Sequence, residues 1–215
     1  MPLGTDYERQ DCSLARSLEL VGERWTLLIL RELMLGPKRF TDLLDALPGL
    51  ARNLLTERLR RLELESLLRR TTLPPPAASR VYALTESGRA LGPSMAALGR
   101  WGIEQLPPAP AKAYFRPEWA VFPLSYMANS DAARGVHEVY ELVIDEQRFH
   151  LRVDDGAVHP HSGGAHDADL VIAMSAETLR DLFFGGLEPA DAVARSLVRF
   201  DGPPETIERA IAILA

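Results

Sequence analysis

The sequence predicts an α+β protein built from two domains that are joined by a proline-rich connection. Apolar residues recur at helical spacing through most of the first 105 positions. Three prolines then fall within positions 107–110, and proline cannot continue a helix. Beyond this break, strand-like runs alternate with helical ones. We therefore expect one domain at 1–106, a linker and connecting segment at 107–135, and a smaller α+β domain at 136–215.

Net charge sets the first limit on function. The 215 residues carry a net charge of −6 at pH 7, which by itself disfavours a nucleic-acid partner. The charge is unevenly divided, because residues 1–106 hold 15 Lys and Arg against 13 Asp and Glu, whereas residues 107–215 hold 9 against 17. Within residues 38–80 the balance is 9 basic to 5 acidic. A locally basic segment in an acidic chain supports a DNA partner without establishing one.

Hydropathy and cysteine content favour a cytoplasmic protein. No apolar run approaches the roughly 18 residues that span a bilayer, and residues 1–6 lack the basic start and apolar stretch of a signal peptide. The single cysteine, Cys12, excludes an intrachain disulfide and suits a reducing compartment. We expect no membrane partner.

The first domain begins with helices whose ends carry capping or stop signals. The expected helices span residues 13–21, 24–35, 42–47 and 51–66. Gly22 closes the first helix, and Gly36 followed by Pro37 stops the second. Thr41 is expected to cap the third. After Thr85, which is expected to cap it, a single long helix should run to about residue 105.

The helix over residues 51–66 separates apolar from polar side chains. At 100° per residue, one side collects Leu54, Leu55, Arg58, Leu59 and Leu62. The other side collects Arg52, Asn53, Thr56, Glu57, Arg60 and Arg61. Taken alone, this pattern fits a solvated surface helix as well as it fits a helix that offers cations and amides to a partner.

A predicted hairpin after this helix favours a DNA-binding helix over a solvated surface helix. Strand-like runs at 67–73 and 80–85 flank a proline-rich tip at 74–79. Short helices, a polar-faced helix and a basic hairpin together predict a winged helix-turn-helix, whose helix enters the major groove of double-stranded operator DNA. The expected DNA contacts are Arg52, Asn53, Thr56 and Arg60 on the helix and Arg69, Arg70 and Arg80 on the hairpin.

Several motifs in this half resemble the HxlR family of bacterial regulators. They are Cys12-Ser13, GERWTLLILREL at 22–33, RFTDL at 39–43, LTERLRRLE at 55–63 and YALTESG at 82–88. The resemblance implies a homodimer that binds pseudo-palindromic operator DNA. One departure is Ala51, where the family often has serine, so an N-cap is lost at the start of the recognition helix. Asn53 could instead cap this helix or pair with adenine.

Apolar residues on the long helix suggest where two subunits meet. Leu91, Met95, Leu98 and Trp101 recur at spacings of four, three and three, which keeps them near one helix face. We expect this face and the helix at 13–21 to form the dimer interface.

The second domain is expected to alternate strands with helices. Strands are expected at 139–145, 148–153, 169–174 and 196–200, and helices at 176–184, 188–195 and 203–214. The motifs ADLVIAMS at 168–175, Leu179 and GLEPADA at 186–192 resemble sterol-carrier-protein-like domains. This resemblance implies an apolar cavity, which in a regulator would hold a small apolar effector near Leu179, Phe183 and Phe184. A closed core serving dimerisation or scaffolding is the alternative.

Cys12 supports a second hypothesis for regulation. Some members of the HxlR family carry a redox-sensing thiol just before the first helix, and the nearby Arg9 and Arg16 would favour its thiolate. With one cysteine per chain, sensing would require a bridge between subunits or a mixed disulfide. A small buried apolar residue is the plainer interpretation of Cys12.

No catalytic motif accompanies these features. Histidines and aspartates cluster at 159–169, but their spacing matches no zinc motif and the segment resembles a loop. Phosphate-binding loops, nucleophile elbows and metalloprotease helices are missing from the sequence. We therefore expect no enzyme activity, no metal and no cofactor. The sequence predicts a dimeric DNA-binding transcription regulator that responds to a small apolar ligand, with redox sensing through Cys12 as the alternative.

Overall fold

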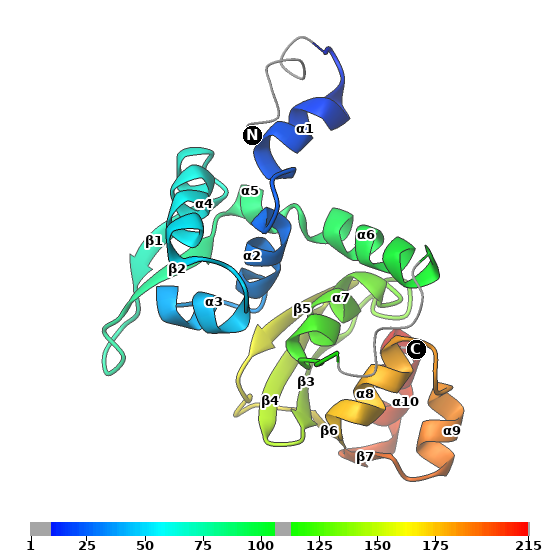
Figure 1. Ribbon diagram of the computed structural model, residues 1–215. Helices are drawn as coiled ribbons and strands as arrows, with labels where there is room; N and C mark the ends of the chain where they lie inside the picture. The colour runs from blue at the N-terminus through cyan, green and yellow to red at the C-terminus, as the bar shows by residue number, and fades with distance from the viewer. Residues whose placement is uncertain (1–9, 106–112, 215) are drawn as a thin grey trace. The chain divides into compact units, whose positions relative to one another are not determined.

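The computed structural model describes residues 10–105 and 113–214, shown in Figure 1. Contacts within the chain divide it into two units, Met1–Leu91 and Gly92–Ala215. The proline-rich segment at 107–110 lies outside the described residues. No helix in the described part of the chain is long and apolar enough to cross a membrane.

The first unit is a winged helix-turn-helix, as the sequence predicts. Its helices are α1 (Ser13–Val21), α2 (Thr26–Leu33), α3 (Phe40–Ala46), α4 (Arg52–Leu64) and α5 (Glu86–Arg89), and its strands are β1 (Leu68–Thr72) and β2 (Arg80–Leu84). The strands pair antiparallel, from Leu68 opposite Leu84 to Thr72 opposite Arg80. Lys38 bridges to Tyr82 on the other side of β2 and widens the base of the hairpin.

Leucine and isoleucine side chains from four elements form the core of this unit. The residues with at most 1% of their surface exposed include Ile29 and Leu30 on α2, Leu43 on α3, Leu55, Leu59 and Leu62 on α4, and Leu68 on β1. Burial of such side chains contributes about 1.5–3 kcal/mol each. The apolar side of α4 therefore holds this helix against the unit, so its opposite side is free to face solvent.

Two helix starts differ from the sequence prediction. Trp25 adopts a left-handed conformation with φ 79°, so α2 begins at Thr26 rather than at residue 24. The prediction that Thr41 caps the third helix is wrong, because Thr41 lies inside α3. Arg39 precedes this helix, and its backbone N–H donates to the Asp42 carboxylate at 3.0 Å.

The prediction of one long helix after Thr85 is also wrong, because two separate helices occupy this region. Thr85 does cap α5, since its hydroxyl oxygen accepts the Gly88 N–H at 3.1 Å. The chain then leaves the helix, and α6 (Gly92–Gln105) starts anew. Pro93 explains the break, because its ring would clash within a continuous helix but is tolerated in a first turn. Leu91 therefore does not lie on the helix that carries Met95, Leu98 and Trp101.

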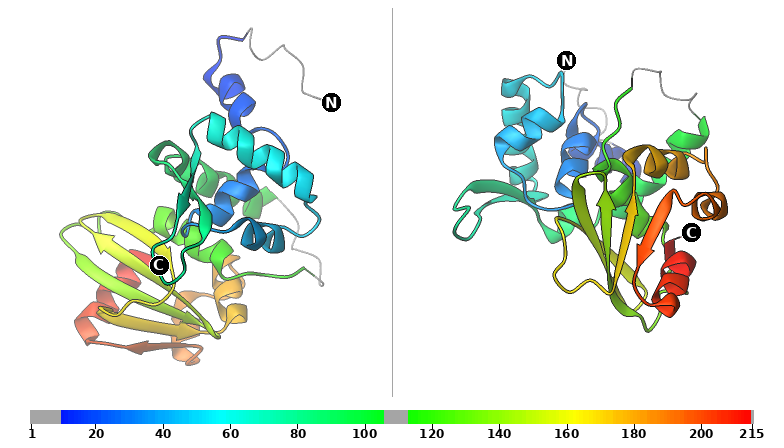
Figure 2. Two further views of the ribbon diagram at one scale, coloured as in Figure 1. Left: turned by 90° about the vertical axis from the view of Figure 1, so that its left-hand side faces the viewer. Right: turned by 90° about the horizontal axis from the view of Figure 1, so that it is seen from below.

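The second unit is a five-stranded sheet that packs against helices, as the views in Figure 2 show. The strands are β3 (His137–Ile144), β4 (Gln147–Asp154), β5 (Ala157–Ser162), β6 (Leu170–Met174) and β7 (Val198–Asp201), in the order β5-β4-β3-β6-β7. Neighbours are antiparallel except for β3 and β6, which are parallel. The expected α+β class is confirmed.

Five helices accompany this sheet in the described part of the second unit. They are α6, α7 (Glu118–Met127), α8 (Ala176–Phe183), α9 (Pro189–Ala194) and α10 (Pro204–Leu214). Helix α7 lies within the segment at 107–135 for which the sequence predicts no structure, and strand β5 falls where a loop is expected. Helix α6 packs against α7.

Candidate DNA-binding surface and ligand cavity

Helix α4 presents a continuous polar side. Arg52, Asn53, Thr56 and Arg60 are all exposed, opposite the buried Leu55 and Leu59. The helix begins after Ala51, which forms no side-chain capping bond, and Asn53 lies inside the first turn. Asn53 therefore does not cap the helix.

The arginines of α4 differ in whether their side chains already contact other residues of the chain. Arg58 forms ion pairs with Glu23 and Glu57, and Arg61 donates to the carbonyl oxygen of Glu19 at 3.3 Å. Within the described residues, Arg60 forms no hydrogen bond or ion pair, and its side chain is available to a partner.

The first turn of α4 carries two further candidates. The Arg52 guanidinium lies over the ring of Phe40, 5.2 Å from its centroid, so α3 helps to position it. The Thr56 hydroxyl donates to the carbonyl oxygen of Arg52 at 3.0 Å. That hydroxyl can still accept a hydrogen bond from a partner.

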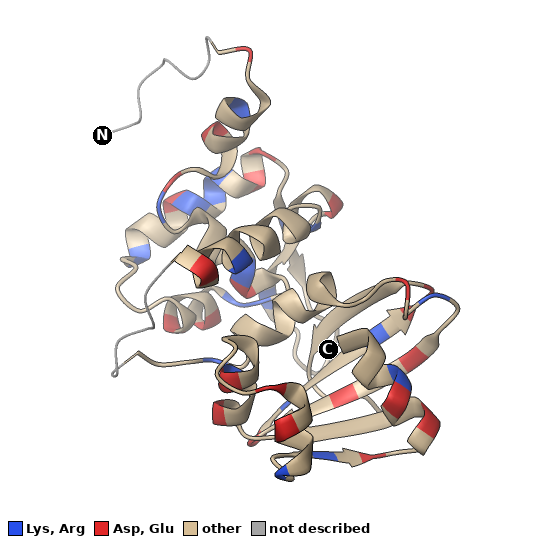
Figure 3. Cartoon of the chain, turned by 90° about the vertical axis from the view of Figure 1, so that its right-hand side faces the viewer, with Lys and Arg blue, Asp and Glu red and all other residues tan. Residues whose placement is uncertain are grey.

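The hairpin arginines do not share one face. Side chains alternate along a strand, so Arg70 and Arg80 lie on one face of the hairpin and Arg69 lies on the other. Arg70 is 3.1 Å from the Glu63 carboxylate and stacks on Tyr82, 5.6 Å from the ring centroid. Arg69 and Arg80 are exposed and form no ion pair within the described part of the chain. Figure 3 marks the Lys and Arg positions along the chain.

Several large apolar side chains are exposed on α1 and α6. On α6, Leu98 is 51% exposed and Trp101 is 59% exposed, whereas Met95 is half-buried. On α1, Leu14 is 67% exposed.

Cys12 lies directly before α1 and is an exposed free thiol, so the interpretation of Cys12 as a small buried residue is wrong.

The second unit contains an apolar cavity of about 880 Å³ between the sheet and its helices. Nearly all the lining side chains are aliphatic or aromatic. They are Leu124 and Met127 of α7; Leu142, Ile144, Ile172, Met174, Val198 and Phe200 of the sheet; Leu179, Leu182 and Phe183 of α8; Glu188, Pro189, Ala190, Ala192, Val193 and Ala194 at α9; and Ala210, Ile211 and Leu214 of α10. Its volume falls in the range of about 300–1,000 Å³ that is typical of small-molecule sites.

The three pocket residues expected from the sequence have different positions. Leu179, which is 5% exposed, and Phe183 both line the cavity. Phe184 is 51% exposed and does not line it. Its ring packs edge-on against Phe183, with centroids 5.2 Å apart, and lies 6.4 Å from Phe115.

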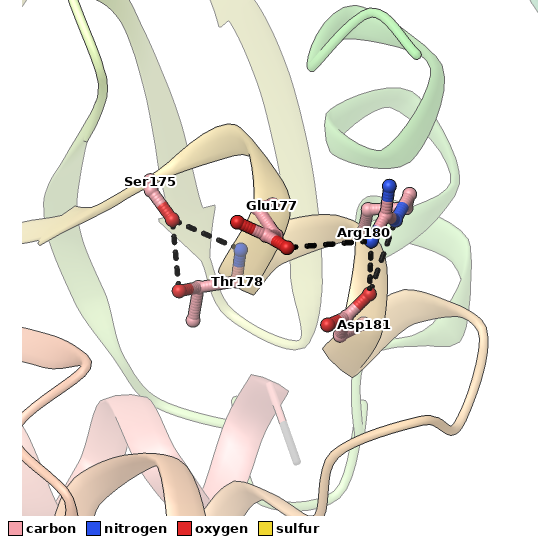
Figure 4. Close-up of polar contacts among 5 residues, drawn as sticks. All are labelled: Ser175, Glu177, Thr178, Arg180 and Asp181. Carbon is pink, nitrogen blue, oxygen red and sulfur yellow. Dashed lines mark hydrogen bonds and ion pairs between the residues drawn. The ribbon is translucent and has the colours of Figure 1, made fainter. Parts of the chain in front are cut away.

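Local polar contacts stabilise α8 itself (Figure 4). The Ser175 hydroxyl oxygen accepts the Thr178 N–H at 3.0 Å and caps the helix. Arg180 lies 2.8 Å from Asp181 and 3.9 Å from Glu177. Leu179 and Phe183 occupy the opposite side and face the cavity.

A partly buried polar cluster fastens α10 to the sheet. Arg209 pairs with the Glu138 carboxylate, which also accepts the Tyr140 hydroxyl at 2.6 Å. Burial and the hydrogen bond to Glu138 raise the pKa of Tyr140 well above its usual value. At the C-terminal end of α10, the Asn129 N–H donates to the carbonyl oxygen of Ile213 at 2.8 Å. This wall of the cavity is therefore held at its middle and at its C-terminal end.

Of the three histidines expected on a turn, two lie instead on the edge strand, whereas His166 does lie in a turn. His159 and His161 belong to β5, and the ring of His161 stacks on that of His150 with centroids 4.8 Å apart. Burial, followed by the charge of His150, lowers the pKa of His161. No group of three or more metal-binding side chains occurs among the described residues.

Comparisons with known proteins agree with both resemblances. The family model for the HxlR-like helix-turn-helix matches residues 20–110, and that of the SCP-2 sterol transfer family matches residues 123–215. The uncharacterized HTH-type transcriptional regulator YvaP of Bacillus subtilis is 34% identical over 94 residues, which cover 44% of this chain and 87% of the relative. Rv3095 of Mycobacterium tuberculosis, also an uncharacterized HTH-type transcriptional regulator, is 46% identical over 95 residues, 44% of this chain and 60% of the relative.

A solved structure of a transcription regulator is also similar in sequence. The reduced form of the transcriptional regulator YodB from B. subtilis is 33% identical, covers 47% of this chain and 100% of its own, and has a TM-score of 0.41.

Fold and relatives together define a helix-turn-helix transcription regulator. Within that class, the chain belongs to the family of HxlR-like helix-turn-helix regulators, and its residues 123–215 match the SCP-2 sterol transfer family.

Proposed function

We propose that this regulator is a homodimer whose affinity for operator DNA is controlled by a small apolar ligand in the second unit. One observation carries the proposal. A chain of a DNA-binding family continues into a unit with a cavity of about 880 Å³ lined almost wholly by apolar side chains. An apolar cavity of this size is costly to leave unfilled, because its lining loses packing contacts.

DNA is read by the polar side of α4. Arg52, Asn53, Thr56 and Arg60 are the base-reading candidates, since side chains of these types pair with base edges in the major groove. Arg80, with Arg69 on the other face of the hairpin, contacts phosphates. Arg70 is the weakest of the three candidates on the hairpin, because it is already paired with Glu63.

The dimer forms through exposed apolar side chains of α1 and α6. Leu98 and Trp101 are more than half exposed, which is costly for large apolar residues unless a partner covers them. Met95 on the same helix and Leu91, directly before it, are the remaining candidates for this interface. A two-fold dimer would present two copies of α4 to a palindromic operator, one helical turn apart.

The ligand acts on DNA binding through α7 and α6. Leu124 and Met127 of α7 line the cavity, while Tyr126 of the same helix contacts Gly92 at the start of α6. Ligand binding changes operator affinity only if the ligand binds the DNA-competent and DNA-incompetent dimers unequally. A difference of about 1–3 kcal/mol is sufficient for a useful switch.

Operator titrations with and without ligand test the proposal. We titrate operator DNA into the full chain and into a version truncated after residue 106, at fixed salt. The ligand is one that raises the melting temperature of the full chain. The truncated version also tests our domain boundaries of 1–106 and 136–215. We expect the full chain to change its operator affinity and the truncated dimer to bind DNA without responding. A response of the truncated dimer would place the sensor in the first domain.

Redox sensing through Cys12 is a second candidate function, favoured by the exposure of this thiol. A disulfide between the Cys12 residues of two subunits would link the α1 helices. If oxidation changes operator affinity and Cys12→Ser abolishes that change while the ligand response persists, both devices operate. If Cys12→Ser has no effect under oxidising conditions, this candidate is rejected.

A further inference from the structure

The apolar cavity of the second unit carries a single formal charge. Among the described residues that line it, Glu188 is the one with an ionisable side chain. It immediately precedes α9 and is exposed, so its carboxylate lies where the cavity meets solvent. Within the described residues this carboxylate forms no hydrogen bond or ion pair, so it is available to a ligand.

The arginines nearest to Glu188 in the sequence do not line the cavity. Arg195 lies at the C-terminal end of α9, whereas Glu188 precedes the first residue of that helix. Arg180 lies on the outer side of α8, where Asp181 and Glu177 neutralise it (Figure 4). Arg199 lies between Val198 and Phe200 on β7, and these two neighbours line the cavity. Because side chains alternate along a strand, Arg199 points to the opposite face of the sheet. There it lines a separate cleft of about 280 Å³.

These positions disfavour an anionic ligand. The carboxylate of a fatty acid or the phosphate of a phospholipid would meet Glu188 and no cation in the described lining. A like charge next to a carboxylate is unfavourable, and removing an unpaired anion from water is costly. A positively charged group at the same place would gain a charge-assisted contact.

We propose that the ligand of this cavity is a lipophilic cation, with an apolar body inside the cavity and a positively charged nitrogen group beside Glu188. This inference rests on the proposed function, because it names the chemical class of the same effector. Phe183 also lines the cavity and adds an aromatic ring, which attracts quaternary ammonium groups. The acidic balance of residues 107–215, with 17 Asp and Glu against 9 Lys and Arg, attracts the same class of ligand.

Three probes with the same apolar chain and different heads test the charge preference. Dodecyltrimethylammonium, dodecanol and dodecanoate are titrated into the full chain below their self-association concentrations, and each displaces a neutral apolar dye, N-phenylnaphthylamine. An exposed ion pair changes affinity by up to about fivefold. We therefore expect the cation to bind up to about fivefold more tightly than the alcohol, and the carboxylate to bind more weakly by a similar factor.

Two charge-neutralising variants locate the effect. Glu188→Gln should bring the three affinities together without weakening the binding of dodecanol. Asp191→Asn is the matched control, because Asp191 is an exposed acid on the same helix that does not line the cavity. It should leave the ratio of cation to carboxylate affinity unchanged.

The outcomes separate this inference from the proposed function. Equal affinities for the three probes, or tighter binding of dodecanoate, would overturn the inference while leaving an apolar effector in place. A preference for the cation that Glu188→Gln leaves intact would overturn the role of Glu188. If no probe displaces the dye, or if the dye itself does not bind, the cavity is not a ligand site and both proposals are rejected.

Discussion

Filling the cavity should stabilise the protein and abolish ligand binding together. Ala192 is fully buried on α9 among the residues around the cavity, so Ala192→Leu directs three added carbons toward the cavity. Burying three carbons at about 0.8 kcal/mol each contributes roughly 2.4 kcal/mol. Ordering the leucine side chain costs about 0.5–1 kcal/mol. We expect the free energy of unfolding to rise by about 1.5 kcal/mol.

The same substitution at a packed position should have the opposite sign. Ala133 is also fully buried, but it does not line the cavity, and its carbonyl oxygen accepts the Gly156 N–H at 2.9 Å. An added leucine there finds no space, and overpacking costs about 1–3 kcal/mol.

Thermal unfolding of the full chain measures both effects. A gain of 1.5 kcal/mol corresponds to a rise in Tm of about 3–6 °C for a chain of this size, and the Ala192→Leu protein should also fail to bind N-phenylnaphthylamine. If Ala192→Leu destabilises the protein as much as Ala133→Leu does, the space beside Ala192 is not available and the reasoning about the cavity is wrong.

Further predictions concern DNA binding and assembly. Arg60→Ala and Asn53→Ala should each weaken operator binding by about 1–3 kcal/mol in fluorescence anisotropy at fixed salt, with unchanged circular dichroism; unchanged affinity in both would contradict the role of α4. Arg80→Ala should make the salt dependence of binding shallower by about one unit of slope, and Arg70→Ala should change it less, because Glu63 already pairs with Arg70. An unchanged slope for Arg80→Ala would show that the hairpin does not touch phosphate. Leu98→Glu should give monomers in light scattering, and an intact dimer would exclude this interface.

Helix positions could be predicted where local signals and tertiary packing agree. Helix α1 matches its expected bounds because Gly22 closes an amphipathic stretch, and the two sides of α4 follow directly from the spacing of Leu55, Leu59 and Leu62. The prediction that Thr41 caps the third helix failed because the helix begins at Phe40, so this good capping residue lies inside it. The break before α6 was visible in the sequence as Pro93, which a continuous helix cannot accommodate.

Proline residues also led the sequence analysis to miss two elements of the second unit. Strand β5 contains Pro160, which is tolerated because β5 is the edge of the sheet and needs no partner on its outer side. Helix α7 contains Pro123, and its sequence follows other prolines, so it resembled a linker. Edge position and tertiary packing decide such cases, and neither can be derived from a local pattern.

The cavity illustrates a similar limit for the candidate site. Its lining comes from four helices and three strands, so no single motif contains it. Leu179 and Phe183 were accessible as one face of an amphipathic helix, but Leu124 and Met127 required knowledge of α7. Glu188 resembles an ordinary residue before a helix, and the role proposed for it follows only from the apolar side chains that line the same cavity.

The position of α7 gives the proposed ligand response a route from the cavity to α6. This helix faces the cavity with Met127 and contacts α6 with Tyr126, whose phenol ring occupies the space that a Cβ at Gly92 would fill. Because Gly92 has no side chain, the two helices approach closely, and a shift of α7 is passed on to α6 rather than absorbed by loose contacts. Only Ala90 and Leu91 separate α6 from α5, the helix that follows the hairpin. In the proposed function, a ligand that moves α7 would therefore act on α6, the helix proposed to hold the dimer together, without touching DNA.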